Sequence, residues 1–222
     1  MTVSAEMSPF DNVFYFPKNI DVRICPKNGM SALKWAIIEA EKEKSHSYKS
    51  YDEFGDTISN YTWRYRQVQM YANSFDLPFR KNSIRVCIRR DPVSRFVSAC
   101  NYLEQSTSGK KETRGNHLVI EKDTPISDLI RMIREEMVKD PHFYTQSWYM
   151  GHPDDYDMIW ELEQLPKALA WLRRHCGIKK DISTFHVNGT SNPTYRVKDL
   201  TEQDIAEIKD LYEKDYRNGW GE

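Results

Sequence analysis

Two segments of this 222-residue chain share one layout, in which a short apolar strand leads through a loop directly into a helix. They are "VRICPKNGMSALKWAI" at 22–37 and "IRVCIRRDPVSRFVSA" at 84–99. The chain continues with strand and helix patterns in alternation, and this alternation predicts an α/β fold, a parallel sheet with helices on both faces. The expected strands are 22–25, 84–89 and 156–160; the expected helices are 31–44, 63–76, 91–104, 126–138, 163–176 and 201–214.

The length fits one α/β domain over residues 1–222, without repeats or low-complexity segments. The core is expected at about 22–216. Residues 1–21 are interpreted as a lead-in whose aromatic side chains pack on the body of the domain. The polar, basic stretch 105–125 is predicted to be a mobile loop.

The composition excludes several classes of protein. A net charge of −1 gives no global sign of nucleic-acid binding, and no apolar run is long enough to span a bilayer. The N-terminal residues lack the pattern of a signal peptide, so we expect a cytoplasmic protein, in a bacterium or in the cytosol of a virus-infected host rather than in the Golgi. The four cysteines have no C-x-x-C spacing and are expected to be buried free thiols.

The first loop has the features of an anion-binding turn. A helix N-terminus offers backbone N–H groups and the positive end of the helix dipole. Gly29 lets the backbone approach a ligand, Ser31 adds a hydroxyl, and Lys27 adds a point charge. The predicted binding loop comprises Lys27, Asn28, Gly29, Met30, Ser31 and Ala32.

The second loop repeats this chemistry at the end of the second strand. Arg90 precedes the helix and Ser98 lies about two turns into it, so that an arginine and a serine are expected to converge on an anion. Arg95 is interpreted as a structural ion-pair partner rather than a ligand contact. Two anion sites at the carboxyl ends of parallel strands indicate one ligand with two separated phosphate groups.

These motifs resemble those of the sulfotransferases. "PKNGMSALKW" is similar to their 5′-phosphosulfate loop, and "RRDPVSRFVSACNYL" to their 3′-phosphate motif. The closer resemblance is to the carbohydrate sulfotransferases of the Golgi class (family 2), whose first loop reads P-K-x-G-x-[TS]-x-x-K and whose later H-[WF]-x-x-Q element is similar to "HFYTQ" at 142–146.

The resemblance implies a P-loop-like sulfotransferase fold and a cofactor, 3′-phosphoadenosine 5′-phosphosulfate (PAPS), without a metal. The sulfuryl group would pass to an acceptor hydroxyl, on a carbohydrate or another small molecule. Lys27 would stabilise the negative charge that grows on the leaving phosphate group. His142 ranks first as the base, with Glu53 and His46 behind it, and Asn188 and Ser191 would belong to a loop over the nucleotide.

Each motif taken alone also fits a structural interpretation. The first loop can be a plain turn before a helix, Arg90 and Ser98 a solvated arginine and a helix serine, and His142 a hydrogen-bonded core residue. Two other functional classes stay open: a small-molecule kinase with a degenerate phosphate loop, and a PAPS-binding module without catalysis. A Walker-type lysine after a second glycine would favour the kinase, and the first loop has none.

Overall fold

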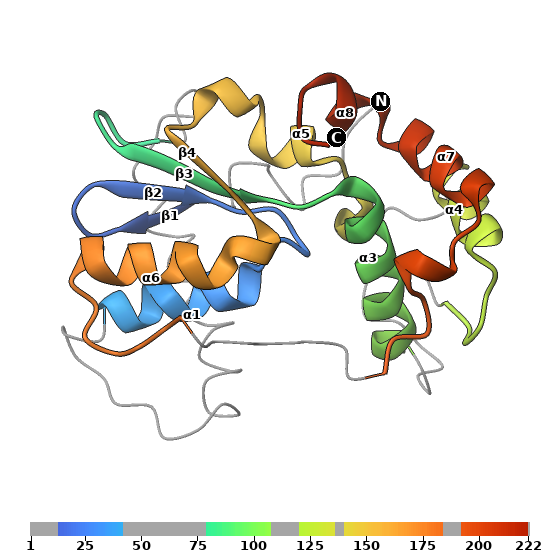
Figure 1. The fold of residues 1–222 in the computed structure, drawn as a ribbon, viewed down its shortest axis with the longest axis horizontal. Helices are drawn as coiled ribbons and strands as arrows, with labels where there is room; N and C mark the ends of the chain where they lie inside the picture. The colour runs from blue at the N-terminus through green and yellow to red at the C-terminus, as the bar shows by residue number, and fades with distance from the viewer. Residues whose placement is uncertain (1–12, 42–78, 108–119, 136–139, 184–191, 222) are drawn as a thin grey trace.

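The computed structural model describes residues 13–41, 79–107, 120–135, 140–183 and 192–221 (Figure 1). Within them the strands are β1 (Val13–Phe16), β2 (Ile20–Arg23), β3 (Ile84–Arg89) and β4 (Met158–Glu161). The α-helices are α1 (Met30–Glu41), α3 (Pro92–Thr107), α4 (Ile126–Arg134), α5 (Gln146–Met150), α6 (Leu165–Cys176), α7 (Glu202–Leu211) and α8 (Glu213–Arg217). Short 3₁₀ turns are η3 (Pro141–Phe143), η4 (Pro153–Asp155), η5 (Leu162–Gln164) and η6 (Val197–Asp199).

The strands form one mixed sheet in the order β1-β2-β3-β4. β2, β3 and β4 are parallel, as predicted, whereas β1 pairs antiparallel with β2 at the edge. The α/β prediction is therefore confirmed, and the prediction of a wholly parallel sheet is wrong at β1. Lys18 and Asn19 both have φ of 59°, which turns the chain back between these two strands.

Successive side chains of each strand point to opposite faces of the sheet, and each face is covered by its own apolar cluster. Val22 and Val86 point into a core against α1 and α6, which lie together on one face (Figure 1). Cys25 and Cys87 point the other way, into a smaller cluster that includes Tyr149 of α5. All four cysteines are buried and free, as predicted.

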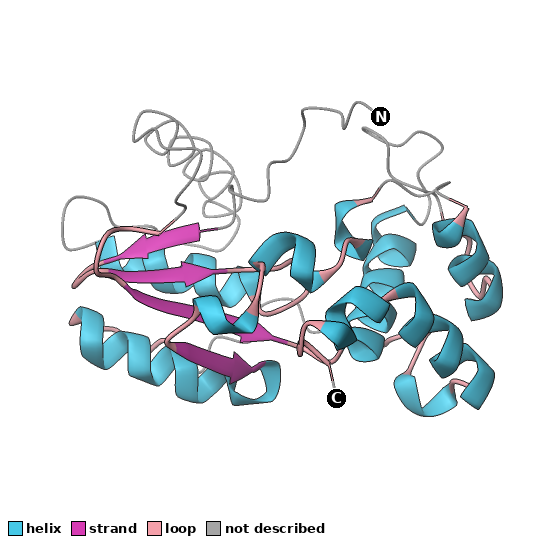
Figure 2. Ribbon diagram, turned by 90° about the horizontal axis from the view of Figure 1, so that it is seen from above, coloured by secondary structure: helices cyan, strands magenta, loops and turns pink. Residues whose placement is uncertain are grey.

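A second group of helices lies beyond the carboxyl ends of the strands. α3, α4 and α7 enclose their own apolar core, and Figures 1 and 2 show this helical half beside the sheet half. α7 begins as predicted: the Thr201 hydroxyl accepts from the Asp204 backbone N–H at 3.1 Å, and the Asp204 carboxylate accepts from the Thr201 N–H at 2.9 Å. The predicted helix 201–214 is nevertheless interrupted at Tyr212, where α7 ends and α8 follows.

Several predicted boundaries move. The expected lead-in contains β1 and the start of β2, and buried Phe14 and Phe16 pack there as strand residues. The first expected strand, 22–25, lies instead at Ile20–Arg23. The strand can include the buried, charged Asp21 because Asp21 Oδ1 accepts a hydrogen bond from Arg80 Nε at 2.6 Å.

The predicted mobile loop at 105–125 falls mostly on residues 108–119, which lie outside the described part of the chain. α3 continues to Thr107, and Ile120 is buried in the helical core. Within the described residues, no helix is long and apolar enough to cross a membrane.

Candidate functional site

The first predicted loop connects β2 to α1 through an unusual backbone. Lys27 has φ of 70° and Gly29 has φ of 79°. A Cβ at Gly29 would lie 3.1 Å from Leu165 Cδ2, so this position is both conformationally and sterically suited to glycine. The first turn of α1 directs its backbone N–H groups and positive dipole end toward this loop. Ala32 is buried and Met30 packs against the sheet core, so they offer a ligand their backbone only.

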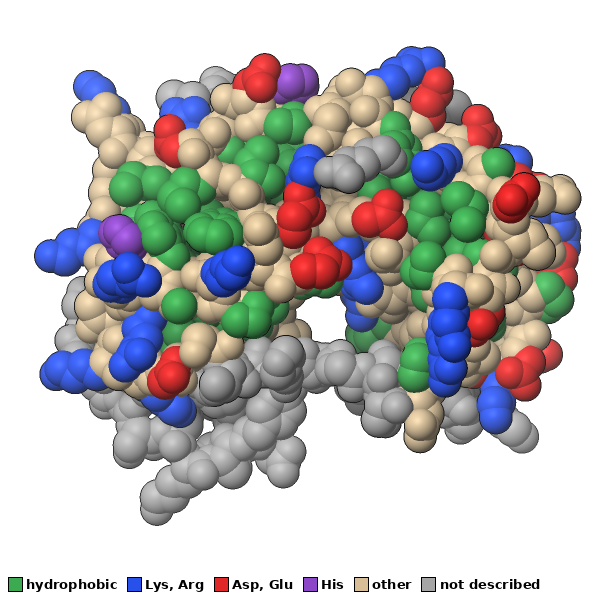
Figure 3. Space-filling model, viewed as in Figure 1, with side chains coloured by type: hydrophobic (Ala, Val, Ile, Leu, Met, Phe, Trp, Pro, Cys, Tyr) green, Lys and Arg blue, Asp and Glu red, His purple; other side chains and the backbone are tan. Residues whose placement is uncertain are grey.

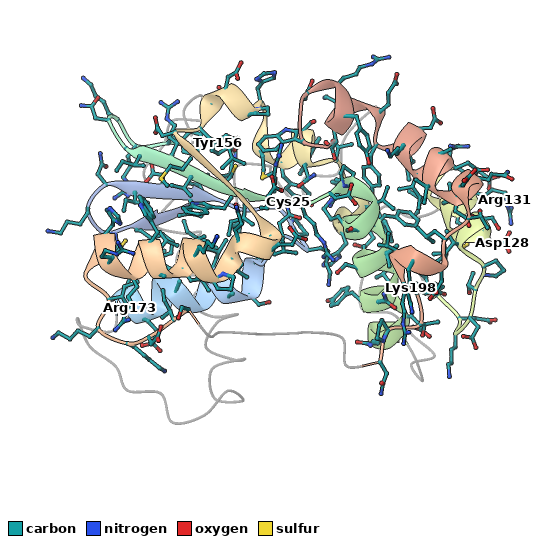
Figure 4. The ribbon with its side chains drawn as sticks, in the orientation of Figure 1. Cys25, Asp128, Arg131, Tyr156, Arg173 and Lys198 are labelled. Atoms are coloured by element: carbon teal, nitrogen blue, oxygen red, sulfur yellow. The ribbon has the colours of Figure 1, made fainter. Side chains whose placement is uncertain are left out.

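Asn28 fixes this loop to the neighbouring strand. Its side chain is buried, and Nδ2 donates to the Ile88 carbonyl at 3.0 Å and to Gln146 Oε1 at 2.6 Å. Its backbone N–H closes a turn onto the Cys25 carbonyl at 3.1 Å. Figure 4 shows Cys25 where the sheet meets the helical half, and the loop therefore stands at that boundary.

Arg90 extends from the end of β3 to the same loop. Its Nη1 donates to the Lys27 carbonyl at 3.1 Å, so the two predicted anion loops are in direct contact. Among the described residues, Arg90 Nε and Asn28 Oδ1 are buried and have no hydrogen-bond partner. A buried N–H without a partner is costly, and a phosphate oxygen is a suitable acceptor for it.

Two of the four residues given catalytic roles from the sequence, Lys27 and His142, contact the same side chain. Lys27 Nζ lies 4.5 Å from the centre of the Tyr102 ring, and the His142 ring centre also lies 4.5 Å from it. Tyr102 is 41% exposed, so this cluster opens to solvent. On the face shown in Figure 3 the molecule is hollowed between its two halves, with both basic and acidic side chains at the edge.

His142 is held by a carboxylate that sequence reasoning missed. Buried Asp140 accepts from the His142 backbone N–H at 2.8 Å, and its Oδ1 lies 2.5 Å from Nδ1. A carboxylate only accepts, so Nδ1 carries the proton and Nε2 is the ring atom that can take one. The sequence "DPH" could have indicated this contact, because it places Asp140 and His142 two residues apart in one turn.

Sequence reasoning also missed Tyr102, although its spacing of four residues from Ser98 could have indicated that it belongs to the site. Ser98 lies four residues before it on α3, so both lie on the same helix face. Ser98 is half-buried on that face, which already carries the contacts of Tyr102 with Lys27 and His142.

Arg95 is structural, as interpreted from the sequence. It is fully buried, and its guanidinium donates to the Tyr144 carbonyl, to the His142 carbonyl at 3.1 Å and to Cys25 Sγ at 3.7 Å. It thereby supports the backbone that carries His142.

The site is positively charged and partly desolvated. Burial, together with the charge of Arg90, lowers the pKa of Lys27 to about 8, while Asp140 acts in the opposite direction. Burial also lowers the pKa of Arg90. An anion that binds beside these two partly desolvated cations stabilises their charged forms.

Some predicted residues lie outside the described part of the chain. These are His46, Glu53, Asn188 and Ser191, as well as the expected helix 63–76. Among the residues that the structure describes, no group of three or more His, Cys, Asp and Glu side chains is arranged to hold a metal ion.

Comparison of the chain with models of protein families, with curated proteins and with solved structures finds no match in any of the three.

Proposed function

We propose that this protein is a sulfotransferase that moves the sulfuryl group of PAPS to an acceptor hydroxyl on a carbohydrate. One observation carries the proposal: Lys27 and Arg90 stand at the ends of adjacent parallel strands and touch, while Lys27 and His142 share one Tyr102 ring. A sulfuryl donor with two phosphate groups needs such a paired anion site, and the acceptor needs a base close to it.

Each side chain has a task that its position supports. The first turn of α1 and Lys27 bind the 5′-phosphate side, where Lys27 stabilises the negative charge of the leaving group. The buried Arg90 Nε, which lacks a partner among the described residues, and Ser98 on the Tyr102 face of α3 suit the 3′-phosphate. When bound, the cofactor supplies an activated sulfuryl group.

His142 is the proposed base. Asp140 keeps the proton on Nδ1 and orients the ring, so Nε2 can take the proton of the acceptor hydroxyl. The carbohydrate nature of the acceptor and the sulfotransferase fold are carried over from the sequence resemblance, and the pairing of the two anion loops supports only the donor side of the proposal.

Calorimetric titration with adenosine 3′,5′-bisphosphate, the desulfated cofactor, tests this proposal directly. We expect micromolar binding without a metal, weakened about ten-fold or more by Lys27→Ala and by Arg90→Ala, because each removes a charged contact to a phosphate. Arg131→Ala is the matched control, since its side chain lies at the outer edge of the helical half (Figure 4). Absence of bisphosphate binding, or magnesium-dependent binding of ATP instead, would overturn the proposal.

The low pKa of Lys27 predicts a pH-dependent affinity for the bisphosphate. In the free protein Lys27 loses its proton near pH 8, whereas a bound phosphate favours the charged form and raises its pKa. The affinity should therefore be full below about pH 8 and fall as the pH rises above it, by up to about ten-fold per pH unit. Titrations from pH 6.5 to 9.5 measure this, and Lys27→Arg, which stays charged, should bind with a flat profile over the same range. A wild-type profile as flat as that of Lys27→Arg would contradict the assignment.

A further inference from the structure

One buried side chain joins the two anion loops. Gln146, the first residue of α5, is fully buried, and its amide contacts both loops at once. Oε1 accepts from Asn28 Nδ2 at 2.6 Å and from the Arg90 backbone N–H at 3.0 Å. Nε2 donates to the Arg90 carbonyl at 2.8 Å.

The position of Gln146 is itself fixed from outside the loops. Its backbone N–H and that of Ser147 donate to the buried carboxylate of Asp215, at 2.8 Å and 2.7 Å. These two bonds therefore fix the position and the orientation of the Gln146 amide. Because it pairs with both the N–H and the carbonyl of Arg90, it fixes the backbone of the second loop at the point where β3 ends.

Asn28 Nδ2 also donates to the Ile88 carbonyl at 3.0 Å, but this bond holds the first loop to β3 and not to the backbone of Arg90. Arg90 Nη1 reaches the Lys27 carbonyl, but this guanidinium is the same group that is proposed to bind a phosphate. Gln146 uses no group that a ligand would need, so it can keep the loops at one separation whether or not a ligand is bound.

We propose that Gln146 is a positioning residue that makes the two anion loops act as one bidentate site for a nucleoside 3′,5′-bisphosphate. The inference rests on the proposed function and assigns the spacing of its two phosphate subsites to one amide. Two subsites held at a fixed distance bind a two-headed ligand far more tightly than a one-headed ligand, because the second contact is intramolecular. With the amide removed, each subsite remains, but the gain from joining them is lost.

The test compares three ligands on each variant by calorimetry: adenosine 3′,5′-bisphosphate, adenosine 5′-monophosphate and adenosine 3′-monophosphate. Wild type should bind the bisphosphate at least about 100-fold more tightly than either monophosphate. In Gln146→Met, which keeps the side-chain length without hydrogen bonds, this ratio should fall to about ten-fold or less. The affinity for each monophosphate should stay within about two-fold of wild type.

A purely structural role would show a different pattern. Ser147→Ala is the matched control: it removes a buried hydroxyl that donates to Asp215 at 2.8 Å, on the same helix but without contact to either loop. It should lower the melting temperature and leave the ligand ratio at the wild-type value. If Gln146→Met does not fold, Gln146→Glu keeps the shape and the accepting oxygen but places a second oxygen against the Arg90 carbonyl, and its ratio should fall too.

The outcomes separate this inference from the proposed function. A Gln146 variant that loses stability yet keeps the wild-type ratio, or weakens all three ligands equally, overturns the positioning role while the proposed function stands. Wild type that binds none of the three ligands overturns the proposed function itself.

Discussion

Replacing His142 with alanine is expected to slow sulfuryl transfer by about 10²–10⁴-fold, the usual contribution of a positioned general base. The bisphosphate affinity should change little, because His142 is assigned to the acceptor side of the site. The rate is measured with cofactor carrying radioactive sulfate and a panel of carbohydrate acceptors.

Asp140, the hydrogen-bond partner of His142, provides a second variant for the same prediction. Asp140→Asn keeps the shape of the side chain but presents an amide to Nδ1, which weakens the preference for the tautomer with a free Nε2. We expect most of the loss seen in His142→Ala and a displaced pH–rate profile. His175→Ala is the matched control, since His175 stacks on Trp171 on α6, away from the loops. Wild-type rates in both His142→Ala and Asp140→Asn would show that another group takes the proton.

Arg95→Ala is expected to lower the free energy of unfolding by about 3–5 kcal/mol, one of the largest single losses in the described part of the chain. Truncation leaves the partly buried carbonyls of His142 and Tyr144 without this donor, and it removes a cation close to the buried carboxylate of Asp215. Urea unfolding followed by circular dichroism measures the change.

An exposed arginine provides the comparison. Arg131 on α4 pairs with Asp128 three residues earlier at 3.0 Å, and both side chains are exposed. Arg131→Ala should therefore leave the free energy of unfolding close to the wild-type value. An Arg95 variant no less stable than the Arg131 variant would contradict the structural role of the buried guanidinium.

The strand and helix order was predictable because each element carries its own local pattern. β3 agrees with the predicted strand residue for residue, since β-branched Ile84, Val86 and Ile88 stand at every second position. β1 was missed because the turn that creates it uses Lys18 and Asn19 at positive φ instead of the usual glycine. Asp21 obscured the start of β2, because its partner Arg80 lies 59 residues further along the chain.

The site was predictable only in part, for a related reason. Lys27 and Arg90 follow parallel strands, so the topology alone brings them to one edge of the sheet. The contacts of Tyr102 with Lys27 and His142 depend on where the helical half sits against the sheet, which no local pattern encodes. The role of Gln146 depends on a contact with Asn28 across 118 residues, which the sequence motif containing it does not reveal.

The anchoring of Gln146 by Asp215 has a consequence for the newly made chain. The ribosome extends a chain by about 5–20 residues per second, and segments that have already emerged fold first. Both anion loops and His142 are made long before Asp215, which lies 69 residues after Gln146. A nascent chain that stops short of α8 therefore holds every charged group of the site but lacks the carboxylate that seats the amide between the loops. The extra affinity for the two-headed bisphosphate should thus appear only when synthesis has passed Asp215, so that tight binding reports on the completion of folding.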